Sequence, residues 1–261
     1  MTSPLIVARG LRKEYGDLVA VDDVSFDVLP GGSLGIVGES GSGKTTVAKM
    51  LVGLERLTSG ELMVAGEDCS LPATRWRDRW RRAGFLQIVF QDPYSSLDPR
   101  QSVGDALREA LGVSGRDKRT AELRARELID LVGMPERVLD ARPSTLSGGQ
   151  RQRVAIARAL ATEPKGVILD ESVAALDVSI QAQILNLLAD IREQTGVAYV
   201  LVSHDLAVVR HVTDQVIVMK AGRIVESGAT GAVLDHPQNE YTQLLRSSVP
   251  GPGWVPGSGV S

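Results

Sequence analysis

The chain has 261 residues, of which 43% are hydrophobic and 23% charged, with a formal net charge of −3. These values are typical of a globular protein with a sizeable core, and they give no general attraction to nucleic acid or to an acidic membrane. No apolar run approaches the roughly 20 residues that a membrane helix needs, and the N-terminal stretch lacks a signal-peptide pattern. We therefore expect any membrane contact to go through a partner. The single cysteine, Cys69, excludes an internal disulfide and an all-cysteine metal cluster within one chain.

Short apolar runs predict β-strands early in the chain, at residues 5–8, 19–21 and 25–28. Tyr15 lies in the stretch 12–16 that connects the first two. Its ring has two interpretations: it stacks on a flat base such as adenine, or it packs beside a turn. The residues alone favour the second interpretation.

A glycine-rich stretch follows the apolar strand pattern at 34–37 and precedes a helical pattern that begins near Lys44. This order of strand, glycine loop and helix predicts a phosphate-binding loop, in which N–H groups and the positive end of the helix dipole surround an anion. We expect Lys44 to reach the β- and γ-phosphates of a nucleoside triphosphate and the Thr45 hydroxyl to hold Mg²⁺. The predicted nucleotide-binding residues of this loop are Gly38, Glu39, Ser40, Gly41, Ser42, Gly43, Lys44, Thr45 and Thr46.

The helical pattern that follows the loop predicts a buried stripe of Val47, Met50, Leu51 and Leu54. A strand is predicted next, at 61–65. The segment 75–82 then places two tryptophans one helical turn apart, with arginines on the other faces. It is a candidate lipid-headgroup or nucleic-acid patch, but its short length and the acidic chain favour a solvated amphipathic helix.

A strand predicted at 85–90 ends at Gln91, and α/β sheets bind ligands at the carboxyl ends of their strands. Gln91 is therefore a candidate ligand-binding residue. The proline- and serine-rich stretch after it, up to Arg100, predicts an exposed loop. The pattern at 103–139 is helical and predicts an insertion between parallel strands.

The stretch Leu146-Ser-Gly-Gly-Gln150 opens a helix predicted over 150–161. Ser147 and Gln150 have the spacing of a capping box, so one interpretation is a well-capped helix. The glycines between them, Gly148 and Gly149, expose N–H groups at a helix start. That makes the segment a second candidate anion site.

Two acidic residues, Asp170 and Glu171, follow the apolar strand predicted at 167–169. Asp170 is placed to hold Mg²⁺ and Glu171 to orient or deprotonate an attacking water, unless one of the two is only a helix-start charge. A lone histidine is usually structural, but His204 follows the strand at 197–202 and lies at the same predicted sheet edge as Gln91 and Glu171.

The C-terminal part of the chain predicts a hairpin at 216–225, a single closing helix at 234–245 and a disordered tail at 250–261.

Six stretches, in this order, resemble the ATP-binding subunits of ABC transporters. They are the phosphate loop, Gln91, Leu146 to Gln150, Val167 to Glu171, Leu176-Asp177 and His204. The match covers about residues 5–224, and the serine–glycine–glycine–glutamine signature is highly specific. The chain is most similar to the oligopeptide, dipeptide and nickel importer subunits in three segments, 89–100, 178–188 and 236–245, the last containing His236-Pro237, Tyr241-Thr242 and Leu244-Leu245.

The resemblance implies an α/β fold: a P-loop NTPase core with a mostly parallel sheet, an antiparallel β-subdomain and a helical subdomain at about 92–160, all within one domain spanning 1–249. It implies an ATPase at the cytoplasmic face of the membrane that couples ATP hydrolysis to solute transport, with peptide as the favoured cargo. The implied partners are a second ATP-binding subunit, membrane permease subunits and, indirectly, a solute-binding protein; no nucleic acid is expected. The alternatives are a different cargo (nickel, an opine or an exported compound) and a soluble ABC ATPase of DNA repair or translation.

The resemblance also implies that two such domains pack head to tail, with each ATP between the phosphate loop of one and the signature of the other. It assigns catalysis to Lys44, Gln91, Glu171 and His204, and Mg²⁺ binding to Thr45, Gln91 and Asp170. The remaining implied nucleotide and dimer contacts are Tyr15 on adenine, then Ser147, Gly148, Gly149 and Gln150 of the signature, and Asp177 at the seam.

Two positions depart from the family pattern. Ser172 and Ala174 stand where proline and serine are common, but neither is expected to touch the phosphates, so we expect hydrolysis to survive. The chain has no cysteine after Cys69, so we expect no C-terminal iron–sulfur cluster of the kind that some peptide-importer subunits carry.

Overall fold

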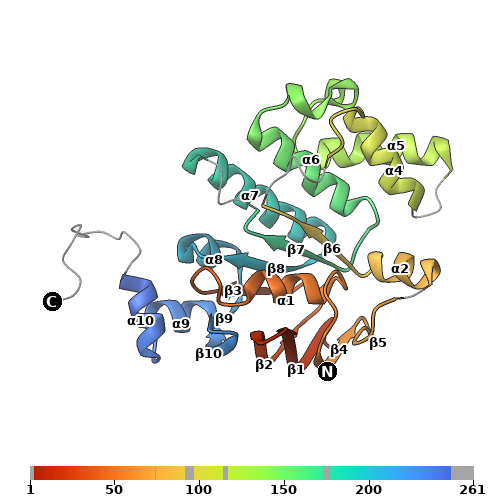
Figure 1. Ribbon diagram of the computed structural model, residues 1–261. Coiled ribbons are helices and arrows are strands. Elements are labelled where there is room, and N and C mark those ends of the chain that lie inside the picture. Colours follow the sequence, from red (N-terminus) through yellow and green to blue (C-terminus); the bar gives the residue numbers. More distant parts are fainter. Residues whose placement is uncertain (1–2, 74, 92–96, 114–116, 173–176, 248–261) are drawn as a thin grey trace.

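The computed structural model describes residues 3–73, 75–91, 97–113, 117–172 and 177–247, apart from the side chains of Trp76 and Val113. Residues 92–96 of the predicted loop, residues 173–176 and the predicted tail lie outside these ranges. Within them the chain forms two β-sheets flanked by helices (Figure 1). No helix in this part of the chain is long and apolar enough to cross a membrane.

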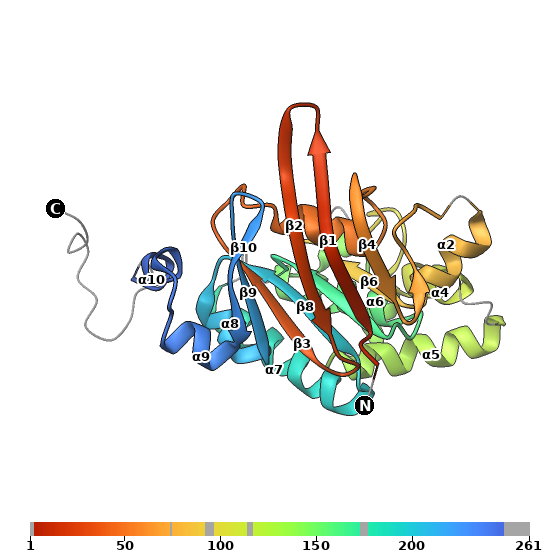
Figure 2. The same cartoon turned by 90° about the horizontal axis from the view of Figure 1, so that it is seen from below.

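The first sheet is antiparallel, with the strand order β2-β1-β4-β5. Its strands are β1 (Ile6–Tyr15), β2 (Leu18–Val28), β4 (Ser59–Val64) and β5 (Glu67–Asp68). Figure 2 shows β1 and β2 as a long hairpin that projects beyond the rest of the molecule. The prediction of three short strands was therefore wrong, because exposed polar residues interrupt the apolar pattern on which that prediction rested, while the backbone ladder continues through them.

The second sheet has the strand order β10-β9-β3-β8-β7-β6 and is parallel except for β10. Its strands are β3 (Ser33–Val37), β6 (Leu86–Val89), β7 (Gly166–Asp170), β8 (Ala198–Ser203), β9 (Gln215–Lys220) and β10 (Arg223–Ala229). Every residue of β3, β7 and β8 is buried, as expected for parallel strands covered on both faces.

The register of the parallel strands aligns their carboxyl ends at one edge of the sheet. Val89 pairs with Leu169 and Val37 with Ser203. The residues that follow these strands therefore meet along that edge, and they include most of the candidate site.

The described helices connect the strands and cover both faces of the second sheet. They are α1 (Lys44–Leu51), α2 (Trp76–Ala83), α4 (Val103–Val113), α5 (Lys118–Leu131), α6 (Gly148–Leu160), α7 (Val178–Thr195), α8 (Leu206–Val212), α9 (Thr230–Asp235) and α10 (Glu240–Ser247), with the 3₁₀ turns η1 (Glu136–Asp140) and η2 (Pro143–Thr145). Figure 1 shows α4 and α5 at the end of the molecule opposite the antiparallel sheet.

Two of the predicted helices differ from the structure. The helix after the signature begins at Gly148 rather than Gln150. The single closing helix predicted at 234–245 is two helices, α9 and α10, because Pro237 lacks an N–H group and disfavours a helical backbone in the residue before it.

Two hydrophobic clusters hold the layers together. One lies between the antiparallel sheet, α1 and one face of the second sheet, and the other lies between the opposite face and helices α4 to α8. Strand β8 contributes to both by alternation, with Val200 in the first cluster and Tyr199 in the second. The predicted stripe on α1 is buried except for Leu54, which follows the helix and is 60% exposed.

Candidate functional site

The glycine-rich loop 38–43 joins β3 to α1 at the carboxyl edge of the sheet. Two of its glycines leave no room for a side chain. A Cβ on Gly38 would lie 2.2 Å from the Met219 carbonyl oxygen, and one on Gly43 would lie 2.4 Å from the Ala20 carbonyl oxygen. Both glycines also have positive φ, so other residues are excluded by space and by backbone strain.

Lys44 begins α1 and is 4% exposed. Its Nζ donates to the carbonyl oxygens of Gly38 and Glu39, each at 2.8 Å. Burial lowers the pKa of Lys44, and the nearby carboxylates of Glu171 and Asp170 oppose that shift. The start of α1 therefore places a buried lysine amine against the loop and near two acidic residues.

Asp170 ends β7 and is 5% exposed. The Thr45 hydroxyl donates to its Oδ1 at 3.1 Å. Burial raises the pKa of Asp170, and the charge of Glu171 adds to the rise. Gln91 lies two residues beyond Val89 of β6, the strand next to β7, and is exposed. These hydroxyl, carboxylate and amide oxygens are hard donors of the kind that Mg²⁺ prefers, so the residues present fit that ion.

Glu171 and His204 follow the neighbouring strands β7 and β8. The His204 Nδ1 atom lies 3.5 Å from Glu171 Oε1, and the Glu171 N–H donates to the Val202 carbonyl oxygen at 2.9 Å. Glu171 has a φ of 48°, which is uncommon outside glycine and often found at functional sites. The structure thus brings Glu171 and His204 together beside the phosphate loop.

Tyr15 ends β1 and is 44% exposed. Partial burial raises the pKa of Tyr15, as does a hydrogen bond to Glu55, and the hydroxyl also contacts the side chain of Thr46. The Lys13 ammonium lies 4.6 Å from the centre of the ring. The Tyr15 hydroxyl is therefore near Thr46 at the end of the phosphate loop, and Tyr15 also lies next to the turn at 16–17 that joins β1 to β2.

The signature segment opens α6 with the predicted capping box. The Gln150 N–H donates to Ser147 Oγ at 3.3 Å, and the Ser147 N–H donates to Gln150 Oε1 at 2.9 Å. A Cβ on Gly149 would lie 2.6 Å from the Ile180 side chain of α7, so packing requires glycine there. Ser147 and Gln150 are exposed, as is Asp177 at the start of α7. Within the described ranges, no hydrogen bond or ion pair joins this segment to the phosphate loop.

One of the two departures from the family pattern is visible. Ser172 is 3% exposed, and its hydroxyl has no hydrogen-bond partner in the described part of the structure. Ala174 lies outside the described residues.

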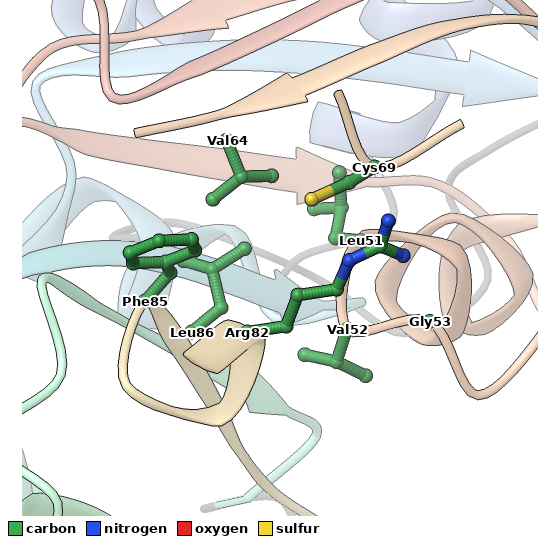
Figure 3. A pocket seen from close by; sticks show the side chains of 8 residues that line it. All are labelled: Leu51, Val52, Gly53, Val64, Cys69, Arg82, Phe85 and Leu86. Carbon is green, nitrogen blue, oxygen red and sulfur yellow. The ribbon is translucent and has the colours of Figure 1, made fainter. Parts of the chain in front are cut away.

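An open groove runs along β6, an edge strand of the second sheet. Its two parts have volumes of about 510 and 440 Å³ and share Leu54, Gln87 and Ile88. Arg79 and Arg82, of α2 in the tryptophan- and arginine-rich segment, line one part of the groove. Figure 3 shows an adjoining pocket beside Cys69 and Phe85, which shares Arg82 and Leu86 with the groove; its volume of about 10 Å³ is too small for a nucleotide.

Sequence reasoning missed the contact between the phosphate loop and the C-terminal helix α10. The Tyr241 hydroxyl of α10 accepts a hydrogen bond from the Glu39 N–H at 3.0 Å. The two residues lie 202 positions apart, and no local pattern predicts such a contact. The one hint in the sequence of a role for this segment was that residues 236–245 resemble the closing segment of the importer subunits.

The comparisons with known proteins agree with this geometry. Residues 21–174 match the ABC transporter family. The chain is 45% identical over 235 residues to the oligopeptide transport ATP-binding protein OppF of Lactococcus lactis, covering 90% of this chain and 73% of that protein. It is 48% identical over 242 residues to OppD of Mycobacterium tuberculosis, covering 93% of this chain but 39% of that protein.

Two solved structures show the same fold. The chain is similar to cbiO1 of Clostridium perfringens, part of the transporter complex cbiONQ, with a TM-score of 0.81 and 27% identity over 89% of this chain and 91% of that one. It is also similar to the dimeric ATP-binding cassette MJ0796 bound to ADP and Pi, with a TM-score of 0.76 and 27% identity over 86% of this chain and 98% of that one. The expected P-loop NTPase fold with its antiparallel sheet is confirmed. The chain belongs to the ABC transporter family, whose ATP-binding subunits are ATPases.

Proposed function

We propose that the chain powers the uptake of peptides by closing on ATP with a second ATP-binding subunit and reopening after hydrolysis. The observation that carries the proposal is the convergence at one sheet edge of a buried lysine in a glycine loop, the Thr45–Asp170 pair and the Glu171–His204 pair. A phosphate cradle, oxygen donors for a cation and a carboxylate next to a histidine are the parts that phosphoryl transfer to water requires.

Each residue has a proposed role in that reaction. Lys44 and the loop N–H groups bind the phosphates, with Tyr15 against the adenine ring. Thr45, Asp170 and Gln91 would hold Mg²⁺, which would neutralise charge that develops on the phosphate oxygens. Glu171 orients and deprotonates the attacking water, and His204 contacts the γ-phosphate.

A second subunit completes the site. Ser147 and Gln150 are exposed at the start of α6, with the half-buried Gly148 between them, and no described hydrogen bond or ion pair joins this segment to the chain's own phosphate loop. The similar cassette MJ0796 is described as a dimer bound to ADP and Pi, which supports this arrangement. We propose that Asp177, exposed at the start of α7, lies at the seam between the subunits.

The groove along β6 supports the proposed attachment to a membrane permease, which would put the chain at the cytoplasmic face of the membrane. Leu54 is exposed there, and Gln91 lies just beyond the end of β6. If a permease segment binds in the groove, movement of Gln91 when the nucleotide binds or is hydrolysed would be transmitted to that segment.

The peptide cargo is supported by the relatives, which are named as oligopeptide transport proteins, and a solute-binding protein would deliver it.

Transport by a reconstituted complex tests the proposal. The chain, its mate and the permease subunits encoded near it are placed in vesicles with ATP on the side of the ATP-binding subunits, and the uptake of a labelled oligopeptide is measured with the solute-binding protein outside. We expect uptake that depends on ATP and is abolished by Glu171→Gln. Uptake of Ni²⁺ without peptide would contradict the cargo, and association with ribosomes or DNA instead of the permease would contradict the transport function.

A further inference from the structure

Helix α10 contacts the phosphate loop through one side chain. The Tyr241 hydroxyl accepts the main-chain N–H of Glu39 at 3.0 Å, and Tyr241 is 6% exposed. In Figure 1, α9 and α10 lie on the same side of the molecule as the loop between β3 and α1. Because Tyr241 lies outside residues 21–174, the matched family region does not contain it.

This contact fixes the position of Glu39, which also binds the amine of Lys44. The Glu39 N–H donates to Tyr241, and its carbonyl oxygen accepts from Lys44 Nζ at 2.8 Å. The Glu39 N–H also belongs to the same planar peptide group as the Gly38 carbonyl, whose oxygen accepts from Lys44 Nζ at 2.8 Å, and the two hydrogen bonds of that group strengthen one another. The Tyr241 hydroxyl thereby sets the position of a carbonyl group that accepts a hydrogen bond from the Lys44 amine.

Tyr241 is itself held in a rigid frame. Its N–H donates to the Asn239 side chain at 2.9 Å, and Asn239 donates to the Val225 carbonyl oxygen of β10 at 3.3 Å. The ammonium of Lys220, the last residue of β9, lies 4.7 Å from the centre of the tyrosine ring. Because β9 also pairs with β3, the strand that enters the phosphate loop, the tyrosine and the loop are fixed to the same sheet.

We propose that Tyr241 is a positioning residue for nucleotide binding: it fixes the first bend of the phosphate loop through Glu39, so that Lys44 and the loop N–H groups are in place when the triphosphate binds. This role rests on the proposed function of the loop. Tyr241 does not touch the nucleotide, and its contribution is to reduce the ordering that binding would otherwise require.

The variant Tyr241→Phe tests the proposal, because it removes the hydroxyl and keeps the ring and its contact with Lys220. Tyr199→Phe is a matched control: Tyr199 is 1% exposed, and its hydroxyl has no hydrogen-bond partner within the described residues. We expect Tyr241→Phe to raise the Kd for Mg-ATP about three- to tenfold, the effect of one hydrogen bond, with kcat at saturating ATP within about twofold of the unaltered protein. Tyr199→Phe leaves both values unchanged.

A second measurement does not depend on nucleotide. Hydrogen exchange of a peptide that spans residues 38–44 is followed in the nucleotide-free protein, and we expect faster exchange in Tyr241→Phe than in Tyr199→Phe. Equal exchange in the two variants, or an unchanged Kd for Mg-ATP in Tyr241→Phe, would overturn the positioning role. Failure of the unaltered protein to bind Mg-ATP would instead overturn the proposed function, and the exchange data would still decide whether Tyr241 orders the loop.

Discussion

The two halves of the proposed site differ in how far one chain completes them. The phosphate loop is built into the sheet, with Lys44 and Asp170 at 4% and 5% exposure and both engaged with neighbouring groups of the same chain. The signature segment is anchored by its buried Leu146, by its own capping box and by packing of Gly149 on α7, whereas Ser147 and Gln150 face solvent. The phosphate-loop half is thus preorganised for a ligand. The signature half presents Ser147 and Gln150 outward, as we expect if it binds the nucleotide of a second subunit.

The largest expected effect is on the phosphate-loop half. Replacing Lys44 by alanine removes the buried amine and should lower ATP hydrolysis about 100-fold or more, because its charge opposes the charge of the phosphates in the transition state. ATP binding by the isolated chain should fall as well. Phosphate release and equilibrium binding measure the two effects, with the unfolding temperature as the control for folding. If Lys44→Ala kept the ATP affinity of the unaltered protein, the phosphate-loop half would not be the half that binds ATP within one chain.

The signature half should behave differently. Ser147→Ala should lower hydrolysis by the assembled pair about tenfold and leave ATP binding by the isolated chain unchanged, because Ser147 acts on the partner's nucleotide. It also removes a helix cap, which costs about 1 kcal/mol of stability.

Asp117→Ala is the matched control for Ser147→Ala. Asp117 caps α5 by accepting from the Arg119 and Thr120 N–H groups, so its loss should cost similar stability without lowering hydrolysis. Equal loss of hydrolysis in both variants would mean that Ser147 is only a cap.

The raised pKa of Asp170 predicts a pH dependence that belongs to the phosphate-loop half alone. As the pH falls, Asp170 becomes protonated at a higher pH than an ordinary aspartate, so Mg²⁺-dependent ATP binding should weaken earlier. For stability the sign is opposite: without Mg²⁺, the contribution of Asp170 is fully present below its unfolded pKa of about 3.9 and is lost as the pH rises through the folded pKa.

Unfolding of the metal-free protein between about pH 3 and 6 measures this effect, with Asp170→Asn as the comparison. The stability of the unaltered protein relative to the variant should fall as the pH rises. A rise would contradict the assigned effect of burial.

The smallest expected effect concerns Tyr15, which is partly exposed. Tyr15→Leu should raise the Kd for ATP a fewfold, in keeping with about 0.5–1.5 kcal/mol for an aromatic pair, with little change in kcat. Tyr15→Phe keeps the ring and should bind almost as the unaltered protein does. If Tyr15→Phe is as weak as Tyr15→Leu, the contacts of the hydroxyl with Glu55 and Thr46 matter more than stacking on adenine.

The parts of the molecule that the sequence predicted well are specified locally. A glycine loop between a strand and a helix, and the box formed by Ser147 and Gln150, depend on residues a few positions apart. The placement of Glu171 and His204 at one edge also followed, because parallel strands align their ends. The roles of these residues stay predictions until they are tested.

The parts that sequence reasoning missed depend on distant contacts or on the backbone. The β1–β2 ladder continues through polar residues, and Leu54 ends an apolar stripe yet lies on an exposed groove. The Glu39–Tyr241 hydrogen bond joins segments 202 residues apart, and only the folded chain reveals it. The break between α9 and α10 could have been predicted from the sequence, because Pro237 interrupts the pattern that suggested one closing helix.

The most direct test of the account is the mass of the protein when hydrolysis is blocked. Glu171→Gln protein, mixed with its natural mate, is examined by light scattering with Mg-ATP, with Mg-ADP and without nucleotide. We predict a stable pair only with Mg-ATP, and its loss when Lys44→Ala is added to both subunits. If the subunits stay separate in Mg-ATP, the two halves do not form one site and the account is contradicted.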